Sequence, residues 1–452
     1  MLAKFLGPFN YGIWGFINLA LRYLSYTSFG LQYALNVELS TQKGTNKNKI
    51  SKIIGNSIVM TFLISVFIIF VGYLIRLKKI ELFPVYSFNR FIIFAVIITF
   101  LTHLVNIFKN IYRSYGYLFR IAFGETLLSV STLLCVFFFS PGRLINALLY
   151  AWIISETISI LVYVVKFPFP IKISIDSNLS RKLLASGISL LIYNMSFYLI
   201  MVVSTTIIST FYSVEEMGYY TLANRITTTS LLGLSAITWV LYPKFLWSLR
   251  KERDLSDTQK TVNQITTIYS NFVYLIIFTV IMFSPILFIY LEKYKPLAPA
   301  LNYLLISQAI FSSCIGYNSL AVARKKEQSV AKIGLITVVF VGLLGIITAK
   351  LKLNFSIVAL TVTFGMIIYT VLQTKLGESL MKQEISTWES FKRIFPPYFL
   401  VPSVIIIIGN LFGYCLISGA IGFTIFIIYN LKRIIFTFNE AKILLLRSDF
   451  KK

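Results

Sequence analysis

The sequence predicts an all-α polytopic membrane protein with about 13 transmembrane helices. Only 13% of its 452 residues are charged and 57% are apolar, with a mean hydropathy of +0.78. A soluble domain averages roughly 25% charged residues, so this composition does not fit a surface that faces water. Long apolar segments recur along the chain, and each can cross a ~30 Å hydrocarbon core as a helix. Single β-strands would leave backbone groups unpaired in lipid, so the segments are predicted to be helical.

The apolar segments cover nearly the whole chain. The last two are joined so tightly around Gly413 that they are predicted to form a helical hairpin. No connection is long enough to hold a soluble domain. The segments lie near residues 10–38, 53–75, 88–108, 116–139, 144–165, 186–211, 218–243, 266–291, 299–322, 330–349, 354–374, 395–411 and 413–431.

The basic residues indicate the orientation in the membrane. Most of the 42 Lys and Arg residues lie in alternate loops, beginning with residues 41–52 and ending with the C-terminal tail. By the positive-inside rule these loops are cytoplasmic, which places the N-terminus outside. Arg76, Lys78 and Lys79 form an outer cluster that the rule does not explain. Since the charge is spread between apolar segments, the net charge of +25 does not indicate nucleic-acid binding.

Residues 6–40 and 212–246 form an internal repeat. Superposing Gly12 on Gly218 without gaps also aligns Asn18 with Asn224. Repeated helical bundles around a central cavity are a common plan in transporters. We therefore expect two repeated lobes around a central cavity, followed by the hairpin. The expected boundaries are 1–170 for the N-terminal lobe, 171–390 for the C-terminal lobe, and 391–452 for the hairpin and basic tail.

Two arginines within the repeated segments are the main candidates for a binding site. Arg22 follows Asn18 by one helical turn, and Arg225 lies beside Asn224 with Thr228 close by. A charge inside the bilayer costs at least ~2.5 kcal/mol, so each arginine marks a candidate site. A planar guanidinium suits bidentate binding of phosphate oxygens. The structural alternative is that each arginine extends to the interface or pairs with a carboxylate between helices.

His103, Glu125 and Glu156 are the candidates for ion coupling. The two carboxylates lie deep in adjacent segments, and His103 is the only histidine in the chain. They could relay protons or cations through the membrane. Hydrogen bonding between helices is the alternative explanation, and the sequence does not decide between the two.

Several kinds of chemistry lack their motifs in this sequence. It contains no GxxxxGK[ST], HExxH or GxSxG motif, so neither ATP hydrolysis nor the common hydrolases are indicated. The three cysteines, Cys135, Cys314 and Cys415, all lie in apolar segments without a CxxC pair. We expect no disulfide, no metal site and no cofactor, and we do not expect an enzyme.

Two motifs resemble a known family. The segment LGPFNYG at residues 6–12 is similar to the start of polysaccharide flippases (Wzx-type O-antigen transporters). These belong to the multidrug/oligosaccharidyl-lipid/polysaccharide exporter (MOP) superfamily. The segment EEMGYYTLANRITTT at residues 215–229, followed by VLYPKF at 240–245, is similar to the opening of their second lobe and is the more specific match. The resemblance covers nearly the whole chain in the order of its spans.

The resemblance implies a V-shaped transporter of the bacterial inner membrane. Its substrate would be an undecaprenyl-pyrophosphate-linked oligosaccharide, such as an O-antigen or capsule repeat unit, moved by alternating access. Arg22 and Arg225 would then bind the pyrophosphate, and Asn18, Asn224 and Thr228 would line the cavity. A polysaccharide polymerase and a chain-length regulator are expected partners, and nucleic acid is not.

One departure from the family concerns the first helix. Family members have a helix before the LGPxxYG segment, which gives fourteen spans with both termini in the cytoplasm, whereas this sequence starts at that segment. We therefore expect that the first helix of the family is missing here. Three other functions stay open: a multidrug exporter of the same superfamily, a lipid II flippase, and a membrane O-antigen polymerase or glycosyltransferase.

Overall fold

The structure, a computed structural model, confirms the all-helical fold class. In the part of the chain that it describes, every regular element is a helix. Eight helices are long and apolar enough to cross a membrane, and up to eleven spans result if each of three bent pairs counts as one. The described residues are 2–41, 47–78, 80–165, 167–169, 171–173, 176–251, 254–383 and 386–446.

The chain divides into two compact units, Met1–Met195 and Ser196–Lys452. The lobe boundaries expected from the sequence stay a prediction. The first unit also contains the start of α7. Its other helices are α1 (Leu2–Ser25), η1 (Tyr26–Ser28), α2 (Leu31–Thr41), α3 (Lys47–Leu77), η2 (Pro84–Tyr86), η3 (Phe88–Arg90), α4 (Ile92–Ser114), α5 (Leu118–Phe138) and α6 (Pro141–Val164).

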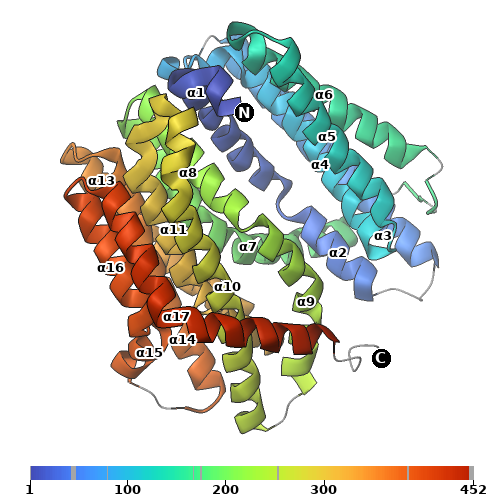
Figure 1. Cartoon of the computed structure of the whole chain (residues 1–452). Helices are drawn as coiled ribbons and strands as arrows, with labels where there is room; N and C mark the ends of the chain where they lie inside the picture. Colours follow the sequence, from blue (N-terminus) through green and yellow to red (C-terminus); the bar gives the residue numbers. More distant parts are fainter. Residues whose placement is uncertain are drawn as a thin grey trace. The chain divides into compact units, whose positions relative to one another are not determined.

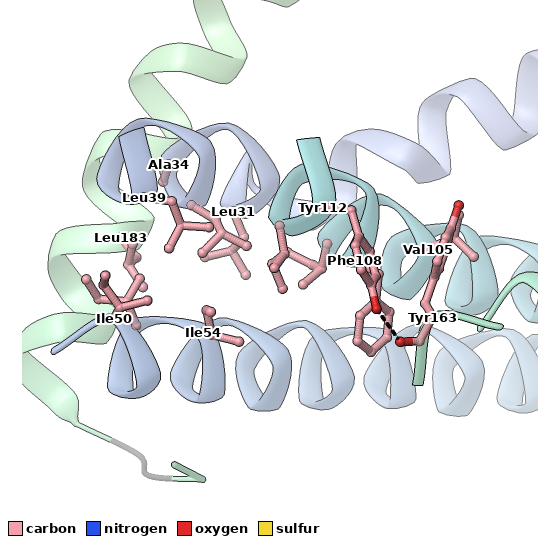
Figure 2. Packing of buried hydrophobic residues seen from close by; sticks show 14 residues of the cluster. Leu31, Ala34, Leu39, Ile50, Ile54, Val105, Phe108, Tyr112, Tyr163 and Leu183 are labelled. Atoms are coloured by element: carbon pink, nitrogen blue, oxygen red, sulfur yellow. Dashed lines mark hydrogen bonds between the residues drawn. The ribbon is translucent and has the colours of Figure 1, made fainter. Parts of the chain in front are cut away.

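In the first unit, α4 is the central helix. It packs against α1, α2, α3, α5 and α6, and α4, α5 and α6 lie side by side (Figure 1). A buried cluster joins α2, α3, α4 and α6 to the start of α7 (Figure 2). Tyr112 and Tyr163 are fully buried within it, and the Tyr112 hydroxyl donates to the Tyr163 carbonyl at 2.7 Å. That bond gives the carbonyl of Tyr163, near the end of α6, a hydrogen-bond donor from α4.

In the second unit, α11 and α14 form the centre. Most of α11 is buried, because α8, α10 and α14 all pack against it. The unit contains the rest of α7 (Ser177–Phe211), α8 (Val214–Ser230), α9 (Leu232–Lys251), α10 (Leu255–Tyr290), η4 (Glu292–Leu297), α11 (Ala298–Ser312), α12 (Ile315–Ala323), α13 (Glu327–Lys350), α14 (Phe355–Leu380), α15 (Thr387–Ile394), α16 (Pro397–Leu411) and α17 (Cys415–Leu446).

Helices α16 and α17 form the predicted hairpin. Gly413 adopts a positive φ of 81° in the turn between them. The hairpin packs on α10 through stacked aromatic pairs, Tyr274 with Phe399 at 4.3 Å and Phe278 with Phe426 at 4.5 Å between ring centroids. The hairpin is therefore part of the second unit rather than a separate appendage.

The two repeated segments are each divided in the middle. Segment 10–38 becomes α1 and α2, and segment 218–243 becomes α8 and α9. In the superposition of Gly12 on Gly218, the last residue of α1, Ser25, aligns with Leu231, which directly follows the last residue of α8. The repeat seen in the sequence therefore corresponds to a repeated helix break.

At the first break, the chain leaves the α-helix through η1. Phe29 and Gly30 follow in the left-handed region, with φ of 49° and 71°. A Cβ on Gly30 would lie 2.1 Å from the carbonyl oxygen of Gly187 on α7, within the same unit. Only glycine fits this position, because both the backbone angle and the close approach exclude a side chain.

The prediction from this geometry is that Gly30→Ala destabilises the protein strongly. A left-handed φ costs about 1–2 kcal/mol for a residue with a Cβ, and overpacking adds about 1–3 kcal/mol. Gly142→Ala on α6 is the control, because a Cβ there meets nothing within 4 Å. Thermal unfolding in detergent should show a lower midpoint than the wild type for Gly30→Ala and an unchanged midpoint for Gly142→Ala. Equal midpoints for the two variants would contradict the close packing at Gly30.

Candidate functional site

Arg225 lies on α8, whose start is fixed by a capping box. The hydroxyl of Ser213 accepts the N–H of Glu216 at 3.2 Å, and the Glu216 carboxylate accepts the N–H of Ser213 at 2.9 Å. About three turns later Arg225 is exposed, and its guanidinium has no hydrogen bond or ion pair with any residue that the structure describes. The helix ends one turn after it.

The two polar neighbours predicted beside Arg225 differ in their surroundings. The Thr228 hydroxyl is exposed but donates to the carbonyls of Asn224 at 3.0 Å and Arg225 at 3.1 Å. The Oδ1 of Asn224 is buried and has no hydrogen-bond partner among the described atoms. Thr228 therefore supports the backbone at the end of α8, whereas Asn224 keeps an unsatisfied acceptor beside Arg225.

Arg22 lies in the last turn of α1, directly before the first break. Its side chain is exposed, and its guanidinium too has no bonded partner within the described ranges. Its carbonyl accepts the Ser25 hydroxyl at 2.7 Å. The amide of Asn18, one turn earlier, donates to the Trp14 carbonyl at 2.7 Å and is half-buried. The Asn18 amide thus has a hydrogen-bond partner within its own helix, whereas the Arg22 guanidinium has none.

Both arginines carry an uncompensated positive charge. Each guanidinium has five donors that are available to a ligand, and bidentate binding of an anion is the arrangement that uses them best. By contrast, five cation–carboxylate pairs form elsewhere in the described chain, and neither arginine belongs to one. The arginines lie in different units, Arg22 in the first and Arg225 in the second.

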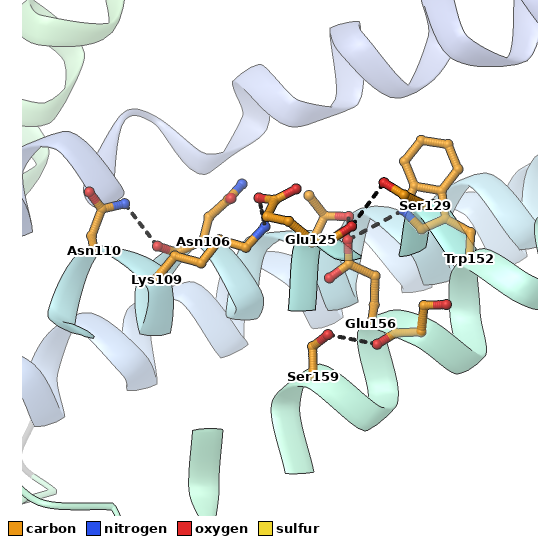
Figure 3. Close-up of polar contacts among 10 residues, drawn as sticks. Asn106, Lys109, Asn110, Glu125, Ser129, Trp152, Glu156 and Ser159 are labelled. Carbon is orange, nitrogen blue, oxygen red and sulfur yellow. Dashed lines mark hydrogen bonds and ion pairs between the residues drawn. The ribbon is translucent and has the colours of Figure 1, made fainter. Parts of the chain in front are cut away.

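The two candidate carboxylates lie near one another on α5 and α6 (Figure 3). Glu156 is buried, and its Oε1 accepts the indole N–H of Trp152 at 3.3 Å and the Thr102 hydroxyl at 3.5 Å. Glu125 is 60% exposed and pairs with Lys109 on α4 at 2.7 Å. Both carboxylates therefore contact neighbouring helices or their own helix, as the structural alternative requires.

His103 has other neighbours than this pair. It is 2% exposed on α4, and its Nδ1 lies 3.1 Å from the Ser65 hydroxyl on α3. Its Nε2 is buried without a hydrogen bond of good geometry within the described part of the chain, although the carbonyls of Leu24 and Ser25 at the end of α1 interact with the ring. His103 thus connects α3 and α4 to the first helix break.

Lys109 is the member of this polar cluster that the sequence analysis missed. The apolar segment expected at residues 88–108 ends just before Lys109, but α4 continues to Ser114. The longer helix brings Lys109 alongside Glu125. The available signal was the spacing, because a lysine four residues after Val105 lies on the same helical face as a buried apolar position.

We predict that Glu156→Ala lowers stability more than Glu125→Ala. The first change removes a buried carboxylate and leaves the half-buried indole N–H of Trp152 without its acceptor, which costs about 1–3 kcal/mol. The second breaks a largely exposed ion pair, worth about 1 kcal/mol or less. Glu156→Gln keeps an oxygen acceptor and should lose less than Glu156→Ala. Thermal unfolding in detergent measures all three variants, and an unchanged midpoint for Glu156→Ala would show that its contacts do not stabilise the lobe.

Comparisons with known proteins place the chain in a family. The sequence profile of the family described as "Polysaccharide biosynthesis protein" matches residues 1–246. Among curated proteins, none matches the sequence.

Solved structures support the same fold. The lipid II flippase MurJ in an inward closed conformation is similar over 94% of this chain and 98% of its own, with 15% identity and a TM-score of 0.63. An inward-facing multidrug resistance MATE family transporter of the MOP superfamily is similar over 84% of this chain and 92% of its own, with 15% identity and a TM-score of 0.60. At such low identity the likeness shows the fold alone.

The apolar helices make the chain a multi-pass membrane protein, and its fold is the one shared by MATE and MurJ. Because the family profile matches more than half of its length, the protein belongs to the polysaccharide biosynthesis protein family.

Proposed function

We propose that this protein is a flippase for lipid-linked oligosaccharide. It moves an undecaprenyl-pyrophosphate-linked repeat unit of O-antigen or capsule from the cytoplasmic to the periplasmic leaflet of the bacterial inner membrane by alternating access. A polysaccharide polymerase and a chain-length regulator are the proposed partners on the periplasmic side.

The observation that carries this proposal is the pair of arginines without partners. A pyrophosphate diester that crosses a bilayer is strongly disfavoured unless positive charge compensates it. Arg22 and Arg225 are exposed, each within about one and a half turns of a break in its helix. Charge-assisted bidentate bonds from these guanidinium groups supply the compensation, and family membership supports a polysaccharide substrate.

The alternative functions explain the two free arginines less well, or explain them equally without distinguishing the substrate. A multidrug exporter for cationic drugs would place two uncompensated arginines against a positively charged substrate, and they would repel it. A lipid II flippase shares the polyprenyl-pyrophosphate, so the arginines would serve it equally, and only the glycan distinguishes the two. A polymerase or glycosyltransferase has no long connection here in which to place an active site.

The prediction for the binding site concerns Arg22→Ala and Arg225→Ala. Loss of one charge-assisted contact costs about 1.5–3 kcal/mol, so each variant should reduce transport about tenfold or more. Arg→Lys keeps the charge but loses the planar fork, so it should be only partly defective. The measurement is restoration of surface polysaccharide in a flippase-null strain, with the amount of each variant in the membrane checked by blot.

Arg143→Ala is the matched control for these variants. Arg143 is also exposed and has no partner for its guanidinium within the described ranges, but it lies in the first turn of α6, away from any break. It should restore full polysaccharide. If the Arg22 and Arg225 variants reach normal levels and restore as much polysaccharide as Arg143→Ala, the proposed pyrophosphate site is wrong.

We propose His103, rather than Glu125 or Glu156, as the group that couples transport to protons. Both carboxylates already have partners, whereas the Nε2 of His103 has none of good geometry among the described residues. A protonated imidazolium can donate from both nitrogens, to Ser65 on one side and to the carbonyls at the end of α1 on the other. Proton binding would then stabilise one arrangement of the first break.

The prediction for coupling is that His103→Gln uncouples transport from the proton gradient. Glutamine retains a hydrogen bond to Ser65 but cannot carry the charge. Transport by the wild type should fall when an uncoupler collapses the gradient, while residual transport by His103→Gln should not respond. Ser65→Ala is the control, since it removes the partner and leaves the imidazole in place. Full activity of His103→Gln with unchanged sensitivity to the uncoupler would exclude His103 as the coupling group.

A further inference from the structure

A groove outside the proposed binding site lies between α5 and α6. It has a volume of about 510 Å³, which is within the range of small-molecule pockets. Its walls are apolar side chains from both helices, with Phe119 85% exposed and Leu161 58% exposed. Along α6 it runs from Ile158 to Val165, about two helical turns or roughly 10 Å. It therefore opens outward from the first unit rather than into the packed interior.

Among the described residues that line this groove, only Arg120 is charged. Its Nη1 donates to the Tyr112 hydroxyl at 2.7 Å and to the carbonyls of Val165 at 3.2 Å and Val162 at 3.4 Å. Its guanidinium carbon also lies 5.2 Å from the centroid of the Tyr112 ring. These contacts fix the guanidinium at the end of α6 and orient it within the groove.

The remaining donors of Arg120 are free. Nε and Nη2 have no hydrogen bond to any described residue, and no described carboxylate pairs with this arginine. The end of α6 contributes only about half a negative charge through its carbonyls. A guanidinium at the wall of an apolar groove thus retains positive charge and directional donors, a combination that favours an anion with oxygen acceptors.

The position of Arg120 along α5 indicates which kind of anion can reach it. Arg120 is the third residue of α5, at the end of the helix that the basic loops mark as cytoplasmic. This level matches the headgroup layer, while the apolar walls at Phe123 and Ile158 extend into the hydrocarbon region. One molecule that has an anionic head at the first level and an apolar chain at the second is a phospholipid.

We propose that the groove is a binding site for an anionic phospholipid of the cytoplasmic leaflet. The phosphate accepts hydrogen bonds from the free donors of Arg120, and one acyl chain lies along the apolar walls between α5 and α6. Basic pockets between transmembrane helices on the cytoplasmic side bind anionic lipid headgroups in this way. The site does not include the arginines proposed to bind the substrate, so this proposal can be tested independently of the flippase proposal.

The experiment is native mass spectrometry of the purified full chain, titrated with phosphatidylglycerol and phosphatidylcholine of identical acyl chains. The wild type should bind phosphatidylglycerol about tenfold more tightly, because the choline ammonium of phosphatidylcholine offsets the phosphate charge that attracts Arg120. Arg120→Gln should remove this preference. Leu161→Trp should weaken binding of phosphatidylglycerol by filling the groove, while it leaves Arg120 and its contacts in place.

Arg181→Gln is the matched control, because Arg181 is exposed in the same unit at the start of α7 but does not line the groove. It should bind both lipids as the wild type does. Equal binding of the two lipids by the wild type, or undiminished binding of phosphatidylglycerol by Leu161→Trp, would overturn the proposal. Tighter binding of a polyprenyl phosphate, with displacement of phosphatidylglycerol from the wild type but not from Leu161→Trp, would also overturn it, since the groove would then hold the carrier lipid.

Discussion

The structure depends most on how backbone carbonyls are paired where the helices of the two repeated segments, α1 and α8, end. Carbonyls at the end of a helix lack a donor within the helix, so other groups of the protein must supply one. At the end of α1, Ser25 and Thr27 donate to the carbonyls of Arg22 at 2.7 Å and Leu24 at 2.5 Å. At the end of α8, Thr228 and Ser230 act in the same way. The Ser and Thr residues of both repeats are therefore structural requirements of the breaks.

These breaks give the arginines their significance. Some charges near other helix ends in the described chain have partners. Buried Glu378, for example, accepts the Ser390 hydroxyl at 2.6 Å and pairs with Arg393 at 3.3 Å, which ties α15 to α14. Arg22 and Arg225 have no such partner within the described part, although an unpaired charge in a membrane protein is costly. A ligand with negative charge is the simplest reason to keep both.

The sequence was sufficient to predict the helices but not all their ends. Each of the thirteen apolar segments overlaps one helix or one pair. Among the described residues, eight helices, or up to eleven spans with the bent pairs, are long and apolar enough to cross a membrane, and the helices of segments 10–38 and 218–243 are not among them. Helix ends depend on local contacts, so the extension of α4 past residue 108 and its Lys109–Glu125 pair were missed. The close approach of Gly30 to Gly187 joins residues far apart in sequence and has no local signal.

The sequence was enough to identify the candidate residues of the site but not the contacts that their side chains make. Depth in an apolar segment identified Arg22, Arg225, His103 and Glu156, because few polar residues occur there. Whether each side chain is free or paired depends on neighbouring helices. The carboxylate of Glu156 accepts a hydrogen bond from Trp152, while the guanidinium groups of Arg22 and Arg225 have no partner in the described part of the chain. The structure therefore separates residues of similar sequence depth into those with internal partners and those available to a ligand.

The central claim is that free arginine side chains beside the helix breaks carry a pyrophosphate across the membrane. The most direct measurement is translocation of a polyprenyl-linked oligosaccharide in liposomes that contain the purified protein, comparing a pyrophosphate with a monophosphate linkage. We predict that the pyrophosphate-linked oligosaccharide is translocated faster than the monophosphate-linked one. Replacing either arginine by alanine should reduce this difference in rate. Equal rates for the two linkages, unaffected by either replacement, would contradict it.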